Sequence, residues 1–537
     1  MGAPPPPSVA DSYANYLVGR LADLRQDHEA AAEHYYEALR RAPDDADLIE
    51  GALSAALAAG DVPHAREIAR LAAQHSAESP RAGLVRAADA LASGRWRAAR
   101  TEMTHVHGDA AEQIMERLLL EWALVGEGRV EPALAIAGDG GGVRPFVGLF
   151  GYQRAMALDY AGRTNDALSA YEQAEQGGIW LPPGIERYAD LLRRTRTPEA
   201  ALEVLDRTDG RLNNPAVAAD AVRLRAGQDL ALPPLTPARG AAVGFYGLAA
   251  VFLQENDSSN GLACLTLALM LDPQFDAARL SVAEAQIGLD HADSARAALA
   301  LVGAQSPYLE SAKIMDAYVL LSQGQSDAAV AEAETVAANG GPRAKKALAD
   351  IYRDVDRDAD AEPIYTALIE AGGNDWQLYF ARGAARQKLG RWPDAEADLK
   401  HALELSPDQS EVLNFLGYSW IDRGEHLQEG LAMVQRAAEI HPDSGAIVDS
   451  LGWAYFKLGD FDQAVTYLER AVELAPADAT LNDHLGDAYW RAGRRIEARF
   501  QWQRALTFGP EDADRAAIQA KISNGLPALP ETRAAAQ

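Results

Sequence analysis

The feature that most constrains the fold of this chain is a repeat of about 34 residues in its C-terminal third. Four glycines mark the repeat at intervals of 34, 35 and 34 residues: Gly383, Gly417, Gly452 and Gly486. Four prolines follow at intervals of 35, 34 and 34 residues: Pro407, Pro442, Pro476 and Pro510. Because two independent markers share one period, the sequence predicts an array of stacked structural units.

The unit at residues 445–478 shows what each marker does. Small Gly452 lets the first helix approach its neighbour, and Gly459 ends that helix because glycine accepts the left-handed conformation. Ala464 gives close contact in a second helix, which Pro476 ends. Such a unit of two helices cannot bury its own apolar face, so neighbouring units must stack.

These residues resemble the tetratricopeptide repeat. The residues of unit 445–478 that match its signature are Leu451, Gly452, Tyr455, Ala464, Leu468, Ala471 and Pro476. Unit 410–444 departs from the pattern by one extra residue and by Gly430, which replaces the usual alanine. Segments such as GAAVGFYGLAAVF and LNFLGYSW also resemble a family of long tetratricopeptide proteins common in proteobacteria, many of which begin with an export signal. The resemblance implies an all-α fold, a right-handed α-solenoid of about 14–15 stacked units including degenerate ones.

The repeat frame also predicts how the whole chain is organised. The predicted segments are a proline-rich lead (1–11), an N-terminal repeat array that is degenerate after about residue 136 (12–228), a proline-rich loop that serves as a hinge between two superhelical halves (229–240), a degenerate middle array (241–374), near-consensus repeats (375–512), a solvated cap helix (513–523) and a tail (524–537). Within the N-terminal array, Ile136–Gly148 is predicted to be a flexible loop, and residues 184–228 to hold one and a half repeats.

Composition narrows the possible partners. The chain has 50 Lys and Arg against 78 Asp and Glu, a formal charge of -28, which would repel nucleic acid. No apolar stretch approaches the roughly 18 residues of a transmembrane helix. The single cysteine, Cys264, excludes an internal disulfide framework and a cysteine-rich zinc module, and its apolar helical context predicts a buried small residue.

A search for catalytic groupings yields no site. The glycines at 138–142 lack the G-K-[ST] continuation of a phosphate loop, and His105 and His107 would point to different faces of a helix. The chain also lacks a G-x-S-x-G elbow and a papain-type cysteine segment. We therefore predict that the chain is not an enzyme and has no catalytic residue, metal ligand or cofactor.

The partner-binding residues are expected on the first helix of each C-terminal repeat, because that helix lines the concave face of the array. The candidate groove residues are Asn414, Tyr418, Asp422, Asp449, Trp453, Phe456, Asp483, Asp487 and Trp490. An aromatic floor edged by carboxylates suits a protein or peptide that carries basic and apolar anchors. Two simpler interpretations stay open: the tryptophans could pack only between helices, and the aspartates could be ordinary solvated residues. Acidic Asp449 also argues against capture of a C-terminal carboxylate.

The leading hypothesis is a non-catalytic scaffold or adaptor that binds a partner segment in this groove. One alternative is a bacterial envelope assembly or carrier factor that handles a polymer or a lipidated client, and another is a regulatory subunit of an enzyme. The expected location is soluble: cytoplasmic from the chain as given, or periplasmic if a signal peptide has been removed or precedes Met1.

Overall fold

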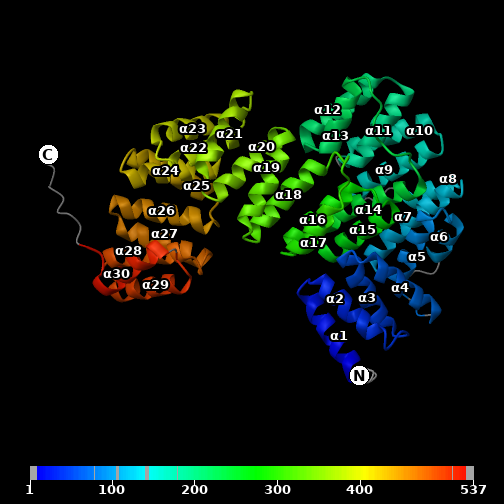
Figure 1. Cartoon of the computed structure of the whole chain (residues 1–537), viewed down its shortest axis with the longest axis horizontal. Coiled ribbons are helices and arrows are strands. Elements are labelled where there is room, and N and C mark those ends of the chain that lie inside the picture. Colours follow the sequence, from blue (N-terminus) through cyan, green and yellow to red (C-terminus); the bar gives the residue numbers. More distant parts are fainter. Residues whose placement is uncertain are drawn as a thin grey trace. The chain divides into compact units, whose positions relative to one another are not determined.

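The computed structural model describes residues 9–527 except 76, 78, 104–107, 139–143, 178–179 and 511. Over these residues the chain forms 30 helices, α1 to α30, and no strand (Figure 1). This all-α repeat solenoid confirms the predicted fold class. The chain divides into two compact units, unit 1 (Met1–Ala338) and unit 2 (Asn339–Gln537). His105, His107, the proline-rich lead up to residue 8 and the tail beyond residue 527 lie outside the described residues.

Unit 1 contains the first nineteen helices of the described chain. They are α1 (Val9–Leu24), α2 (His28–Leu39), α3 (Ala46–Ala59), α4 (Val62–Gln74), α5 (Pro80–Ala92), α6 (Trp96–Met103), α7 (Ala110–Gly126), α8 (Val130–Ala137), α9 (Arg144–Tyr160), α10 (Thr164–Gln176), α11 (Pro182–Thr195), α12 (Pro198–Leu212), α13 (Pro215–Arg225), α14 (Pro237–Gln254), α15 (Ser258–Leu271), α16 (Asp276–Gly288), α17 (Ala292–Ala300), α18 (Leu309–Ser322) and α19 (Ser326–Asn339).

Unit 1 folds back on itself. The helices α3, α5, α7 and α9 are the first members of successive pairs, and each of them contacts α14 or α15 (Figure 1). These are the helices that the repeat places on the inner side of an array. The inner side of the N-terminal repeats is therefore filled by two later helices of the same chain.

The glycines of α14 allow this close approach. Gly240 lies against the ring of Trp122 in α7, and a Cβ at Gly247 would lie 2.5 Å from Leu149 in α9. Trp122 is fully buried and donates from Nε1 to Oε1 of Gln153 at 2.6 Å. Side chains at these glycine positions would separate α14 from α7 and α9.

Helix α15 is apolar on nearly all sides because it lies inside unit 1. Cys264 is fully buried there, which confirms the prediction of a small buried residue. Thr266 is buried as well, and its Oγ1 donates to the carbonyl oxygen of Leu57 in α3 at 2.7 Å. A contact between residues 209 positions apart fixes the fold-back of the chain.

Two predicted breaks differ from the structure. The proline-rich segment 229–236 lies inside unit 1, and the division into units falls between Ala338 and Asn339, not at the hinge predicted for 229–240. The segment is fixed because Arg187 donates to the carbonyl of Pro233 at 2.7 Å and Arg239 to that of Pro234 at 3.1 Å. The loop predicted for Ile136–Gly148 is shorter, since α8 ends at Ala137 and α9 begins at Arg144.

Unit 2 is built from paired helices and a final single helix. Its helices are α20 (Pro342–Asp354), α21 (Asp358–Glu370), α22 (Trp376–Lys388), α23 (Trp392–Leu405), α24 (Ser410–Arg423), α25 (Leu427–Ile440), α26 (Gly445–Leu458), α27 (Phe461–Leu474), α28 (Ala479–Arg491), α29 (Arg495–Thr507) and α30 (Asp512–Asn524). A Cβ at Gly452 would lie 2.6 Å from Leu468, so the small residue is required where α26 meets α27.

Candidate partner-binding groove

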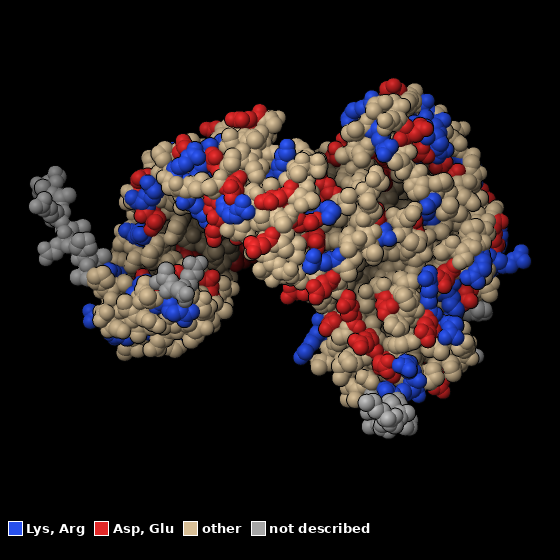
Figure 2. Space-filling model, in the orientation of Figure 1, with Lys and Arg blue, Asp and Glu red and all other residues tan. Residues whose placement is uncertain are grey.

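The nine residues predicted from sequence lie on three helices that occupy the same place in consecutive repeats. Helix α24 carries Asn414, Tyr418 and Asp422; α26 carries Asp449, Trp453 and Phe456; α28 carries Asp483, Asp487 and Trp490. Successive helices of this set contact each other, α24 with α26 and α26 with α28. Figure 2 shows that unit 2 is hollowed near α26, with acidic side chains beside the hollow. We call these nine residues the groove residues.

The aromatic part of the groove centres on Trp453. Its ring is half-buried and stacks on Phe456 of the same helix, with ring centroids 4.7 Å apart. On its other side it stacks on His484 of α28, with centroids 4.0 Å apart and planes 17° from parallel. Trp453 therefore joins two repeats and still presents part of its ring to solvent.

Asp449 is paired within the chain. Its side chain is buried, 6% exposed, and its carboxylate lies 2.9 Å from Nδ1 of His484. Burial of the imidazole opposes its protonation, but the charge of Asp449, with Asp483 and Asp487 nearby, raises the pKa of His484. A charged histidine then neutralises the acid that was expected to face a ligand.

The acids of α28 are paired by the last helix. Lys521 of α30 places its Nζ 2.7 Å from Asp483 and 2.9 Å from Asp487. Asp487 is only 5% exposed and also accepts a hydrogen bond from Nε1 of Trp502 at 2.8 Å. Helix α30 is therefore not simply a solvated cap, because its inner side supplies the countercharge for the last repeat.

The remaining groove residues lie nearer the surface. Asp422 is exposed and pairs with Lys457 at 2.9 Å. Burial, together with the charges of Asp422 and Asp449, raises the pKa of Tyr418 to about 12. Asn414 is half-buried, and its Oδ1 is a buried acceptor that has no hydrogen-bond partner among the described residues. The rings of Trp490 and Trp502 lie 5.5 Å apart, and Arg495 lies over Trp490.

The structure thus places the groove residues on neighbouring helices. It corrects the prediction that their carboxylates are free to pair with a ligand. All four aspartates have a cationic partner in the chain. Sequence reasoning missed His484 and Lys521, although the spacing between each acid and its basic partner could have indicated the pairing. The pairs Asp449–His484 and Asp422–Lys457 span 35 residues, and Asp487–Lys521 spans 34, which is one repeat in each case.

The described residues hold neither a candidate metal site nor a candidate membrane span. No group of three or more His, Cys, Asp or Glu side chains in that part of the chain could hold a metal ion. Among the described helices, none combines the length and the apolar character needed to cross a membrane.

Comparison with known proteins points to one repeat type. The family model described as tetratricopeptide repeat matches residues 314–375, 380–445 and 450–515. These stretches include eight of the nine groove residues, and Asp449 lies just before the third stretch.

Several solved structures are similar to the chain. A tetratricopeptide repeat protein from Parabacteroides merdae is 14% identical with a TM-score of 0.40, and the match covers 46% of this chain and 99% of that one. The Cut9–Hcn1 hetero-tetramer of the APC/C is 15% identical with a TM-score of 0.40 and 96% of each chain covered. PilW, a type IV pilus biogenesis factor, is 20% identical with a TM-score of 0.32, covering 34% of this chain and 85% of that one. No curated protein matches the chain.

Proposed function

This chain is a tetratricopeptide repeat protein, and we propose that it is a non-catalytic scaffold whose C-terminal repeats bind a segment of a partner protein in the groove of unit 2. The repeat fold supports a protein-interaction scaffold in general. The narrower proposal concerns which part of the chain binds and what kind of segment it accepts.

The observation that carries the proposal is the row of partly exposed rings in unit 2. Tyr418, Trp453 and Phe456 come from consecutive repeats and are half-buried, so each keeps a fixed position and an open surface. Aromatic side chains held in this way are the residues that contribute most to protein interfaces. A partner segment with apolar side chains spaced to meet them is the best match.

The fold-back of unit 1 favours unit 2 as the binding part. In unit 1 the inner helices α3, α5, α7 and α9 already contact α14 or α15 of the same chain. A partner segment would have to displace these buried helices, which would expose a large apolar surface to water. The equivalent helices α24, α26 and α28 carry the half-exposed rings instead.

Charge has a smaller role in this proposal than the composition suggests. Asp449, Asp483 and Asp487 are held by His484 and Lys521, so they offer little to a basic ligand. Asp422 is the exposed acid of the set, and its partner Lys457 is on the surface too. A basic residue of the partner can compete for Asp422 at low cost, since exposed ion pairs contribute only about 0–1 kcal/mol.

The test is affinity capture with the full-length chain, followed by titration of the purified partner. The variant Trp453→Ala removes the central ring, and Phe500→Ala removes an exposed ring of α29 that is outside the groove. We expect Trp453→Ala to weaken the partner by about 30-fold or more, the effect of a central interface residue. Phe500→Ala should bind like wild type.

Circular dichroism would first confirm equal helicity in the three proteins. Equal affinity of wild type and Trp453→Ala for every captured protein would show that the groove is not the binding surface. A loss in both variants would place the partner on the outer face of unit 2 instead.

A further inference from the structure

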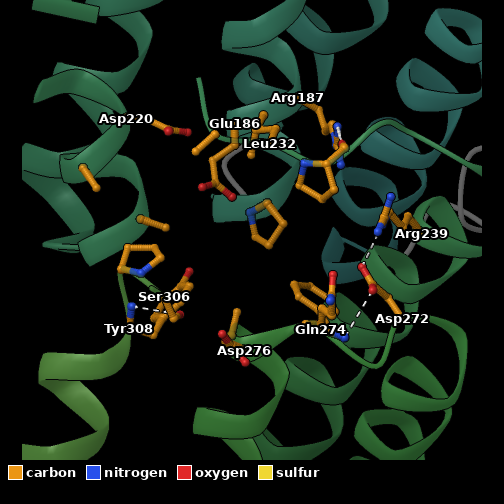
Figure 3. Close-up of a pocket in the computed structure, with 18 of the residues that line it drawn as sticks. Glu186, Arg187, Asp220, Leu232, Arg239, Asp272, Gln274, Asp276, Ser306 and Tyr308 are labelled. Atoms are coloured by element: carbon orange, nitrogen blue, oxygen red, sulfur yellow. Dashed lines mark hydrogen bonds and ion pairs between the residues drawn. The ribbon is translucent and has the colours of Figure 1, made fainter. Parts of the chain in front are cut away.

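A cavity of about 360 Å³ lies within unit 1, far along the chain from the groove residues (Figure 3). It is formed by α11, α13, the proline-rich segment 229–236, the start of α14 and the turns that precede α16 and α18. A volume of this size is in the range of small-molecule sites. The groove residues lie on α24, α26 and α28 of unit 2, and none of them lines this cavity.

Two buried carboxylates in the cavity form no ion pair with the described residues. Glu186 is 8% exposed and Asp220 is 5% exposed, so both are more than nine-tenths buried. Figure 3 shows the carboxylate of Glu186 projecting from α11 into the cavity. The carboxylate of Glu186 forms no hydrogen bond or ion pair with the described residues, and Oδ2 of Asp220 is buried without a hydrogen-bond partner among them.

Arg187 and Arg239, two of the neighbouring cations, are engaged elsewhere. Arg187 donates to the carbonyl of Pro233 at 2.7 Å, and Arg239 pairs with Asp272 at 3.2 Å. Asp276 pairs with Arg279 at 2.6 Å. Arg223 lines the rim, where its guanidinium is exposed to solvent and acts on Asp220 only as a nearby charge.

Burial of these two acids has a measurable consequence for their protonation. Burial and the charge of Asp220 raise the pKa of Glu186 to about 8, against the opposing charge of Arg187. Burial also raises the pKa of Asp220 to about 6, although a backbone hydrogen bond from Ala231 and the charge of Arg223 oppose the shift. Unpaired buried carboxylates are costly, and they persist in proteins mainly where they serve a function.

The rest of the lining is suited to the apolar part of a ligand. Leu232 and Val243 are aliphatic, and Phe275 and Tyr308 provide aromatic rings. Aromatic rings attract cations, and two carboxylates can accept the parallel hydrogen bonds of a guanidinium. A metal ion is a poorer match, because no group of three ligating side chains that could hold one occurs in the described chain.

We propose that this cavity binds an organic cation, a guanidinium or primary ammonium group on a short aliphatic stem, which pairs with Glu186 and Asp220. The same chemistry occurs in free small amines and in Arg or Lys side chains of a partner protein. The cation would convert two unpaired acids into a buried, hydrogen-bonded ion pair, and Glu186 would release its proton on binding.

The experiment is isothermal titration of the full-length chain at neutral pH with two probes, agmatine and the capped peptide acetyl-Ala-Arg-Ala-amide. Glu186→Gln and Asp220→Asn are the test variants, and Glu203→Gln on the exposed side of α12 is the matched control. We expect wild type to bind one probe molecule per chain with a saturable isotherm. The affinity for the probe should fall at least tenfold in both test variants and stay unchanged in the control. Because Gln removes an unpaired buried acid, Glu186→Gln should keep or increase the thermal stability of the chain.

Two readouts decide the proposal. Titration in buffers of different ionisation enthalpy should show proton release for wild type and a smaller release for Glu186→Gln. Binding of agmatine alone supports a free small amine, whereas binding of the peptide supports a side chain of a partner. Absence of saturable binding by wild type up to the millimolar range for both probes, or equal affinity in wild type and both test variants, would overturn the proposal.

Discussion

At the scale of single residues, the groove depends on His484 more than its sequence context suggests. The ring lies against Trp453 on one side and holds the carboxylate of Asp449 with Nδ1. Asp449 and Trp453 could be predicted because they occupy ligand-lining positions of the repeat. Their shared partner could not, because the sequence pattern does not show which neighbouring side chain turns toward them. The same holds for Glu186, whose exposure to a cavity depends on three distant segments.

The pH response of this ion pair can be predicted from its pKa shift. The pKa of His484 is raised in the folded chain, so the stabilisation is fully present below about pH 6.5 and is lost as pH rises through the folded-state pKa. We expect Asp449→Asn to destabilise α26 and α28 by about 1–3 kcal/mol at about pH 6, because it removes a charged hydrogen-bond partner. The difference from wild type should narrow toward pH 9.

Hydrogen exchange of peptides from α26 and α28, compared between variant and wild type at each pH, measures this effect locally. Asp462→Asn, at an exposed position of α27, is the control and should match wild type throughout. A difference that stays constant across the pH range would mean that His484 does not titrate in this pair.

At the scale of elements, α30 does more than end the array. The repeat frame predicts its position after Pro510 and a solvated surface, but its inner side carries buried Ile518 and the paired Lys521. The prediction missed this pairing because a cap helix has no repeat signature to align. The helix closes the array by neutralising the acids of the repeat before it, which is a specific way of ending a solenoid.

Removal of the positive charge of Lys521 should destabilise the C-terminal end of unit 2. Lys521→Met leaves Asp483 and Asp487 close together without a cation, and breaking a buried pair costs about 3–5 kcal/mol. We expect faster hydrogen exchange in α28 and α30 and little change in α20 to α23. Arg470→Met, which breaks the exposed pair with Glu473 in α27, is the matched control and should have almost no effect. Equal exchange in the two variants would show that α30 is held by its apolar contacts alone.

At the scale of the whole molecule, the repeat period predicts that the chain consists of helix pairs, but it does not predict where the chain divides into two compact units. The period identifies helix pairs wherever the glycine and alanine markers survive, and these are local signals. The fold-back of α14 and α15 onto α3, α5, α7 and α9 is a long-range contact between degenerate repeats, and no periodic marker reports it. The prolines of 229–240 predict a hinge because proline breaks helices, whereas in the structure Arg187 and Arg239 hold the carbonyls of Pro233 and Pro234.

This difference leads to a prediction about where the chain can be cut. A fragment of residues 1–338 retains α14 and α15, whereas a fragment of residues 1–228 lacks them and exposes the inner sides of α3, α5, α7 and α9. We expect the longer fragment and the complementary 339–537 to be monodisperse in gel filtration and to unfold cooperatively. The 1–228 fragment should bind a hydrophobic dye and aggregate, because Trp122 and Leu149 lose the helix that covers them. If 1–228 instead unfolds as cooperatively as 1–338, then α14 and α15 only rest on an array that is already stable, and a partner segment could replace them.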